Sequence, residues 1–273
     1  MDTLLFAPQT RTQLFSLSTA LPHALLLTGA AGSGKLTVAR MLAKEAKAEG
    51  VTEVAPDQKG TISIDDIRAL YQRTRARQKG MQVVIIDHAE AMGIEAQNAF
   101  LKLLEEPRSG VVFILTTPTQ EALLPTIVSR VQSVAILRCS QVKLQEFALK
   151  LRPELNPQEL SQLLFVANGR PAVVARLVKS PEAFEQFKTI MKRAKELLGA
   201  SQYERLLHVT KLAQNKEETV ALLEAMARMV QIQLLSKPTP KWIAMAEGLE
   251  TCLSRLAQNG NLRAQLTALF MSY

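Results

Sequence analysis

The stretch from Leu25 to Arg40, LLLTGAAGSGKLTVAR, constrains the fold of this chain more than any other. The apolar run at 25–27 predicts a buried strand, and a helical pattern follows the glycine-rich turn after it. Gly29, Gly34 and Lys35 stand at the spacing of the phosphate-binding loop, GxxxxGK[ST]. Glycines permit positive φ angles and let backbone N–H groups approach an anion closely. The pattern therefore predicts a strand, a phosphate-binding turn, and a helix whose N-terminus faces the same anion.

The last position of this motif departs from the pattern. Lys35 is expected to reach the β- and γ-phosphates of ATP or ADP, but Leu36 stands where a Ser or Thr hydroxyl binds Mg²⁺. Thr37 follows one residue late, so its side chain is turned by about 100° on the helix. We expect the loop to hold phosphate and to hold magnesium weakly or not at all; the alternative is a turn that binds nothing. The candidate nucleotide contacts in this stretch are Gly29, Gly32, Ser33, Gly34, Lys35, Leu36 and Thr37.

The composition favours a helix-rich protein with more than one domain. The chain has 273 residues, of which 47% are hydrophobic and 5% aromatic. Its net charge of +8 is unevenly spread, because residues 1–138 carry 15 Lys and Arg against 13 Asp and Glu, while residues 139–273 carry 18 against 12. Such a surplus permits a polyanionic partner without naming one.

Two features of the sequence bear on the compartment. Cys139 and Cys252 are far apart, which excludes a cysteine-cluster zinc site and a disulfide framework, so we expect no bound metal and no zinc. The N-terminus lacks the basic flank and apolar core of a signal peptide, and no apolar run reaches the ~18–20 residues of a membrane span. We therefore expect a cytoplasmic protein without membrane contact.

Strands and helices alternate through residues 1–138. Uninterrupted apolar strands indicate a parallel sheet covered on both faces, and the alternation indicates a doubly wound α/β domain. After Ser140 only helical patterns follow. The expected strands are 25–27, 51–54, 83–86, 111–115 and 134–137. The expected helices are 8–20, 35–48, 64–79, 96–106, 141–151, 157–167, 171–178, 181–198, 201–213, 216–236, 239–258 and 260–271.

A second candidate group of the phosphate site follows the strand at 83–86. Asp87 stands where P-loop proteins place a carboxylate that holds Mg²⁺. In hydrolytic relatives the next residue is a glutamate that orients water, and here it is His88, so we expect hydrolysis to be weak or to fail. Glu90 is expected to begin the next turn, with a displaced general base as the alternative. In a doubly wound sheet the loop, Asp87 and Thr117 should meet at the carboxyl edge.

Three stretches carry a resemblance to a known family. They are HALLLTGAAGSGK (23–35), VVIIDHAEAMGIEAQNAFLKLLEEP (83–107) and ILTTPTQEALLPTIVSR (114–130). In these stretches the chain resembles the clamp-loader subunits of bacterial DNA polymerase III, which belong to the AAA+ family, and among them the delta prime type. The resemblance implies an AAA+ P-loop NTPase-type α/β domain over 1–138. The remainder matches in layout alone, with a small helical lid over 139–180 and an all-α collar or oligomerisation domain over 181–273.

The resemblance also implies a function in DNA replication. Such a subunit helps to load the sliding clamp in a hetero-pentamer with gamma- or tau-like ATPase subunits and a delta subunit, and meets primer-template DNA through the whole complex. Ser129 and Arg130 resemble the motif from which clamp-loader subunits project an arginine into a neighbour's ATP site, although Val131 replaces the usual cysteine. Arg130 is therefore the candidate catalytic residue, acting in trans; the alternative is a surface or helix-capping arginine.

The chain departs from active members of the family at three positions of one nucleotide site. These are Leu36, His88, and Ala172, which stands where active relatives place a nucleotide-sensing arginine. The cysteine cluster that binds zinc in many relatives is also absent. One relaxed requirement for hydrolysis explains the three losses together. The interpretation is a clamp-loader subunit that hydrolyses ATP weakly or not at all; the alternatives are an autonomous AAA+ ATPase and a repurposed AAA+ scaffold that binds protein partners.

Overall fold

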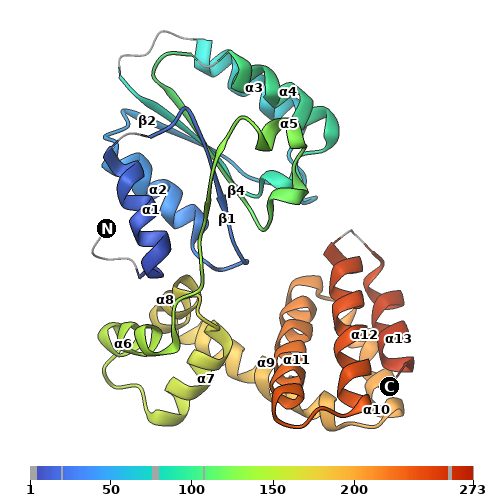
Figure 1. The fold of residues 1–273 in the computed structure, drawn as a ribbon. Helices are drawn as coiled ribbons and strands as arrows, with labels where there is room; N and C mark the ends of the chain where they lie inside the picture. The colour runs from blue at the N-terminus through green and yellow to red at the C-terminus, as the bar shows by residue number, and fades with distance from the viewer. Residues whose placement is uncertain (1–4, 20, 76–79, 107, 258–259, 273) are drawn as a thin grey trace. The chain divides into compact units, whose positions relative to one another are not determined.

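Five strands form one parallel sheet in the first part of the chain (Figure 1). The structure, a computed structural model, describes residues 5–19, 21–75, 80–106, 108–257 and 260–272. The spatial order is β2-β3-β4-β1-β5, and every pairing is parallel, which confirms the predicted sheet. The strands are β1 (Ala24–Thr28), β2 (Gly50–Val54), β3 (Gln82–Ile86), β4 (Val111–Thr117) and β5 (Gln132–Ala135).

Helices cover both faces of the sheet, and the side chains of β1 show how. Leu25 and Leu27 point to the face covered by α1 (Pro8–Thr19) and α2 (Lys35–Glu45). Ala24 and Leu26 point to the opposite face, which α3 (Ile64–Arg75), α4 (Ile94–Glu105) and α5 (Pro125–Val128) cover. Because successive residues of a strand face opposite sides, an apolar run of this kind fits only a strand buried on both faces.

The element boundaries differ from the sequence prediction in a few places. β5 begins and ends two residues early, because the N–H of Leu137 donates to Thr10 Oγ1 of α1 instead of to a strand. α2 ends at Glu45, soon before Lys47 takes a φ of +53°. α4 begins at Ile94, two residues early. The predicted end of the third helix, at 76–79, lies outside the described residues.

Contacts divide the chain into two compact units, Met1–Ala175 and Arg176–Tyr273. The first contains the sheet together with α6 (Gln141–Leu151) and α7 (Pro157–Ala167), and α8 (Pro171–Lys179) runs across the boundary. The predicted three-part division, at 138/139 and 180/181, stays a prediction. None of the helices in the described ranges is long and apolar enough to pass through a membrane.

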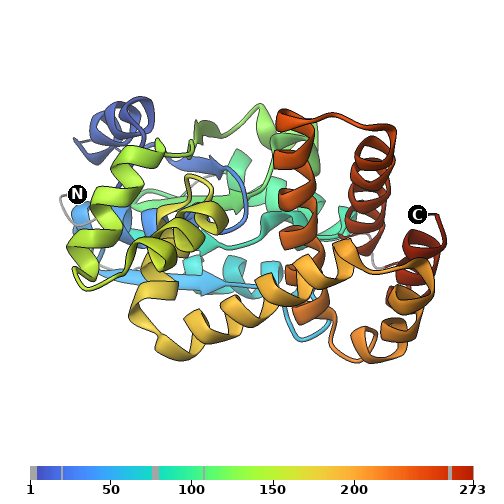
Figure 2. The same ribbon diagram turned by 90° about the horizontal axis from the view of Figure 1, so that it is seen from below.

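The described residues of the second unit form helices and no strand (Figure 2). Its helices are α9 (Pro181–Gly199), α10 (Gln202–Leu212), α11 (Lys216–Ser236), α12 (Pro240–Ala257) and α13 (Leu262–Met271). A buried arginine, Arg205, closes the end of α9: its Nε donates to Leu197 O at 2.9 Å and its Nη2 to Leu198 O at 3.4 Å. Burial lowers the pKa of Arg205. The guanidinium thus supplies donors to carbonyls that a helix end leaves without partners.

Between α4 and β4, the aromatic rings of Phe100 and Phe113 meet edge to face at a centroid distance of 5.3 Å, and both side chains are almost fully buried. We expect Phe100→Ala to lower the free energy of unfolding of the first unit by about 3–5 kcal/mol, because it removes a buried ring and leaves a cavity. Phe15→Ala is the matched control, since that ring is 66% exposed and its loss should cost within about 0.5 kcal/mol. Urea unfolding followed by circular dichroism measures both; a Phe100→Ala loss below about 1 kcal/mol would contradict the role given to this contact.

Candidate functional site

The predicted phosphate-binding turn lies between β1 and α2, at the carboxyl edge of the sheet. Gly32 and Gly34 have φ angles of +73° and +94°, where residues with a Cβ are strained. Gly34 directly precedes α2, so the first N–H groups of this helix face the turn. The backbone therefore has the shape that the motif predicts.

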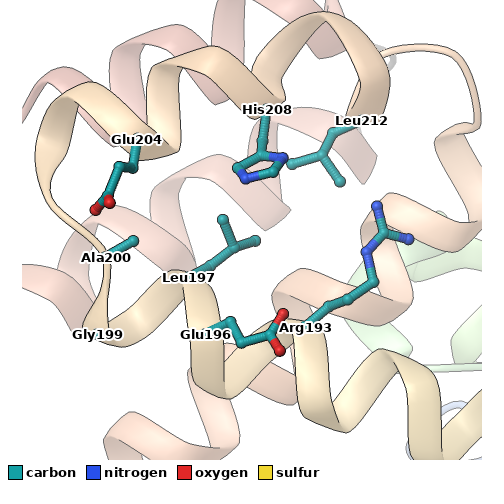
Figure 3. A pocket seen from close by; sticks show the side chains of 8 residues that line it. All are labelled: Arg193, Glu196, Leu197, Gly199, Ala200, Glu204, His208 and Leu212. Atoms are coloured by element: carbon teal, nitrogen blue, oxygen red, sulfur yellow. The ribbon is translucent and has the colours of Figure 1, made fainter.

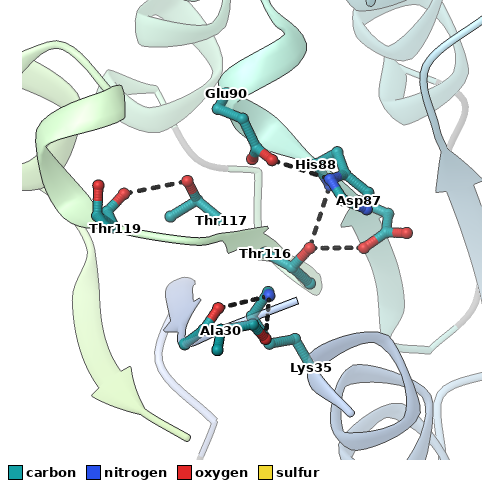
Figure 4. A network of polar contacts seen from close by, with 9 residues as sticks. Ala30, Lys35, Asp87, His88, Glu90, Thr116, Thr117 and Thr119 are labelled. Carbon is teal, nitrogen blue, oxygen red and sulfur yellow. Dashed lines mark hydrogen bonds and ion pairs between the residues drawn. The ribbon is translucent and has the colours of Figure 1, made fainter. Parts of the chain in front are cut away.

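The ammonium group of Lys35 is buried against carbonyl groups of the turn (Figure 4). Its Nζ donates to Gly29 O at 2.7 Å and to Ala30 O at 3.2 Å. Burial lowers the pKa of Lys35, and the negative charges of Glu90 and Asp87 oppose this effect. The turn and the end of β3 are thus close enough to interact electrostatically, as the sheet topology requires.

Ser33 indicates that the turn is able to receive an anion. Its hydroxyl oxygen is buried and has no hydrogen-bond partner in the structure. Leaving a buried polar group without a hydrogen-bond partner costs about 1–3 kcal/mol, and a phosphate oxygen would accept a hydrogen bond from this hydroxyl. Together with the glycine backbone and Lys35, this hydroxyl fits the phosphates of ATP or ADP.

The magnesium half of a P-loop site does not fit the residues present. Leu36 is half-buried and packs on the apolar cluster under α1 and α2. Thr37 is exposed one residue further along the helix. The side chain at the metal-binding position therefore belongs to the core. Within the described ranges, no three His, Cys, Asp or Glu side chains gather as metal ligands.

Asp87 follows β3 and is held by β4 instead of by the turn. Thr116 Oγ1 donates to Asp87 Oδ1 at 2.5 Å, and the same hydroxyl oxygen accepts from the backbone N–H of His88 at 3.1 Å (Figure 4). Thr117, which the sequence named for this site, donates its hydroxyl to Thr119 O at 3.0 Å. Thr116, the neighbour of Thr117 in β4, thus orients Asp87.

His88 and Glu90 form a pair beside this network. His88 takes a left-handed conformation with φ of +55°, and its Nδ1 lies 2.8 Å from Glu90 Oε1 in the short helix η1 (Ala89–Ala91). The hydrogen bond to Glu90 raises the pKa of His88. Burial would raise the pKa of Glu90, but the hydrogen bond and charge of His88, a backbone hydrogen bond and the nearby Thr117 hydroxyl together outweigh it, so the pKa is lowered. One oxygen of the Glu90 carboxylate thus pairs with the imidazole, while the other, Oε2, is buried without a hydrogen-bond partner among the described residues.

The first turn of α8 lies against the phosphate-binding turn. A Cβ added to Gly32 would stand 2.7 Å from Val173 Cγ2, and one added to Gly34 would stand 3.5 Å from Ala172 Cβ. Arg170 Nη1 donates to Ala31 O at 3.1 Å. The helix that carries Ala172 thus contacts the turn through small and apolar side chains, and the arginine that reaches the turn stands two residues earlier.

Arg130 lies just after α5 and makes its contacts with α5 and α4. Its Nη1 donates to Thr126 O at 3.0 Å and to Ser129 Oγ at 3.3 Å. Its Nη2 lies 3.0 Å from Glu105 Oε1, at the end of α4. The arginine side chain is 39% exposed, so it is both anchored and accessible.

Gln97 fastens α5 to α4. This buried side chain donates from Nε2 to Met92 O at 3.0 Å and accepts from the N–H of Leu124 at 2.8 Å. Leu124 is the residue that precedes α5. A buried amide with both ends satisfied specifies one arrangement of the two helices.

Sequence comparison connects this geometry to known proteins. Residues 46–140 match the protein family described as DNA polymerase III, delta subunit. DNA polymerase III subunit delta′ of Pseudomonas aeruginosa is 33% identical over 183 residues, covering 57% of this chain and 55% of that one. Subunit delta′ of Haemophilus influenzae is 32% identical over 144 residues, covering 52% and 43%.

The chain is similar to DNA polymerase III subunit delta′. It spans about half the length of these two relatives. The gamma/tau subunit of Mycobacterium tuberculosis is 34% identical over 133 residues, covering 40% of this chain and 23% of that one.

Solved structures identify the fold. A DNA polymerase III gamma subunit-related protein of Thermotoga maritima superposes with a TM-score of 0.57 at 20% identity, covering 96% of this chain and 97% of that one. The RuvB Holliday junction branch migration motor of the same organism gives a TM-score of 0.54 at 13% identity, covering 96% and 85%. The fold is of the AAA+ type, as the sequence predicted.

Three residues that the sequence interpretation did not select take part in the site. Thr116 orients Asp87, Arg170 contacts the phosphate-binding turn, and Glu105 pairs with Arg130. Thr116 and Thr117 are neighbours, and neighbouring side chains of a strand face opposite sides of the sheet. The strand pattern could therefore have indicated Thr116 as well. The other two depend on contacts across 139 and 25 positions of the chain, which no local pattern reports.

We expect Glu90→Gln to lower the pKa of His88, because the charged hydrogen-bond acceptor is lost. The raised pKa of His88 adds stability that is fully present below its unfolded value of about 6.5 and disappears as the pH rises through its folded value. The variant should therefore lose most stability in mildly acidic solution and least in alkaline solution. NMR titration of the His88 imidazole in the parent and the variant measures the pKa; an unchanged His88 titration would contradict the pairing.

Proposed function

We propose that this chain is a delta prime-like subunit of the DNA polymerase III clamp loader, which loads the sliding clamp on DNA in replication. In this role it hydrolyses ATP weakly or not at all and supplies Arg130 in trans to a neighbouring ATPase subunit. The observation that carries the proposal is a contrast between two parts of one fold. The candidate nucleotide site has Leu36 and His88 at its hydrolytic positions, whereas Arg130, just after α5, is both anchored and accessible.

The relatives support a clamp-loading role. They include subunits delta′ and gamma/tau of DNA polymerase III, and replication factor C subunit 4 of Encephalitozoon cuniculi, which is 31% identical over 142 residues and covers 51% of this chain and 44% of that one. Similarity to several subunit types supports a member of a hetero-oligomer better than an autonomous enzyme. We infer partners of three kinds: gamma- or tau-like ATPase subunits and a delta subunit in a hetero-pentamer, the sliding clamp, and primer-template DNA. We place the assembly in the cytoplasm.

The chain's own nucleotide site supports binding more than turnover. Gly29–Lys35 provide N–H groups, a hydroxyl and an ammonium for the phosphates of ATP or ADP. The hydroxyl that would hold magnesium is missing at Leu36, and Asp87 already accepts from Thr116. His88 follows Asp87 with its imidazole tied to Glu90, so no carboxylate stands there to orient an attacking water. We therefore propose a weak or absent magnesium ion and no zinc.

Arg130 suits a role in a neighbour's site. A guanidinium stays charged at physiological pH and offers a planar set of donors that matches phosphate oxygens. Placed at the neighbouring subunit's ATP, it stabilises the negative charge that develops as the γ-phosphoryl group is transferred. Its anchorage to α4 and α5 means that little reorganisation is needed when the phosphate arrives.

We expect Lys35→Ala to weaken nucleotide binding by the isolated chain by roughly 1.5–3 kcal/mol, the range for a charge-assisted hydrogen bond. Titration of a fluorescent ADP analogue, with and without Mg²⁺, measures it, and magnesium should change the affinity little because of Leu36. Lys44→Ala, on the exposed end of α2, is the control. If the parent chain binds nothing, or the variant binds equally well, the turn is structural only.

We expect Arg130→Ala to lower ATP turnover at the adjacent subunit by about 10³–10⁵-fold, the range of arginine fingers supplied by another protein. Arg130→Lys should not restore the rate, because lysine lacks the planar guanidinium. The measurement is single-site turnover in a reconstituted complex in which only that subunit hydrolyses ATP.

Arg68→Ala is the matched control for this assay, because Arg68 is also an exposed arginine in an ion pair, with Asp65 of the same helix. It should leave turnover unchanged. A chain that does not co-purify with the ATPase and delta subunits would overturn the clamp-loader proposal. A complex that assembles with Arg130→Ala and keeps its full rate would overturn the in-trans role alone.

A further inference from the structure

Glu105 occupies a position that helix energetics disfavour. It is the last residue of α4, and a carboxylate there faces the partial negative charge of the helix C-terminus. Its Oε1 lies 3.0 Å from Arg130 Nη2. The positive charge of Arg130 offsets the repulsion between the Glu105 carboxylate and the helix C-terminus. The contact with Arg130 therefore explains why an acidic side chain is tolerated at the end of α4.

The contact completes the anchorage of the guanidinium. Nη1 is engaged by Thr126 O and Ser129 Oγ, and Nη2 by Glu105. Among the residues that the structure describes, none accepts from Nε. The contacts of Nη1 and Nη2 thus hold the Arg130 side chain in one conformation, while the N–H at Nε remains available to donate a hydrogen bond.

α4 holds the Arg130 segment at two points. Gln97 accepts from the N–H of Leu124 before α5, and Glu105 holds the arginine after it. These two residues of α4 are eight positions apart, which is about 12 Å along a helix axis. A short helix such as α5, with one turn, gains a defined direction from two attachments to a longer one.

We propose that Glu105 is the positioning residue for Arg130, presenting the guanidinium in one conformation to the phosphate of a neighbouring subunit. This inference rests on the proposed role of Arg130 in trans. Restraining a long side chain before the encounter removes an entropic cost that would otherwise fall on the catalytic contact. Because the side chains of Arg130 and Glu105 are 39% and 50% exposed, their ion pair contributes modestly to this restraint.

A double-mutant cycle in the reconstituted complex tests this role, with turnover expressed per assembled complex. We expect Glu105→Ala to lower single-site turnover at the adjacent subunit by about 2- to 5-fold, as loss of a weak contact should. Glu105→Gln, which keeps an acceptor of the same shape without the charge, should give an intermediate rate. In the Arg130→Ala background, Glu105→Ala should have no further effect, because its whole contribution passes through the arginine.

Glu106→Ala is the matched control, since this neighbouring glutamate is also exposed and has no ion-pair partner among the described residues. Glu106→Ala should leave turnover unchanged. Neither Glu105→Ala nor Glu106→Ala should change the thermal unfolding temperature of the isolated chain by much. The positioning role is overturned if Glu105→Ala and Glu105→Gln keep the parental rate, or if Glu105→Ala lowers the rate equally with and without Arg130. If Arg130→Ala itself has no effect, the in-trans function fails; if Arg130→Ala acts and Glu105→Ala does not, only the positioning role fails.

Discussion

The parallel pairing of β1 with β4, and of β4 with β3, determines where the polar residues of this molecule lie. Parallel strands end at the same edge, so the turn after β1, Asp87 after β3 and Thr116 in β4 are brought together although they lie far apart in the chain. The buried polar side chains of β1 and β4, Thr28, Thr116 and Thr117, also stand at this carboxyl end of the strands. The burial of three strands and the location of the candidate phosphate site are thus consequences of one arrangement.

The groups at this edge satisfy one another. Lys35 donates to carbonyls of its own turn, Asp87 accepts from Thr116, and His88 pairs with Glu90. Each contact lowers the cost of holding a polar group near the low-dielectric interior. Ser33 Oγ and Glu90 Oε2 are exceptions, because both atoms are buried and neither has a hydrogen-bond partner among the described residues.

The sequence predicted the sheet and most helices because their signals are local. An apolar run reports burial on both faces, and the glycine spacing reports the turn before α2. The end of β5 could not be predicted, since it depends on Thr10, a residue 127 positions from Leu137. The partners of the site residues were also beyond local patterns: nothing near Arg130 in sequence indicates that Glu105 holds it, and nothing near Gly32 indicates that Val173 covers it. Side-chain pairing across helices is specified by packing, which spacing does not encode.

The left-handed conformation of His88 has a consequence for what this chain is able to become. A non-glycine residue at a φ of +55° carries strain of the order of 1–3 kcal/mol. A glutamate introduced at position 88 would keep that strain, lose the hydrogen bond to Glu90 and face a second carboxylate in its place. A hydroxyl introduced at position 36 would have to leave the apolar surface on which Leu36 rests. Substitutions at positions 36 and 88 toward the residues of a hydrolytic site would therefore need accompanying changes in the side chains packed around them.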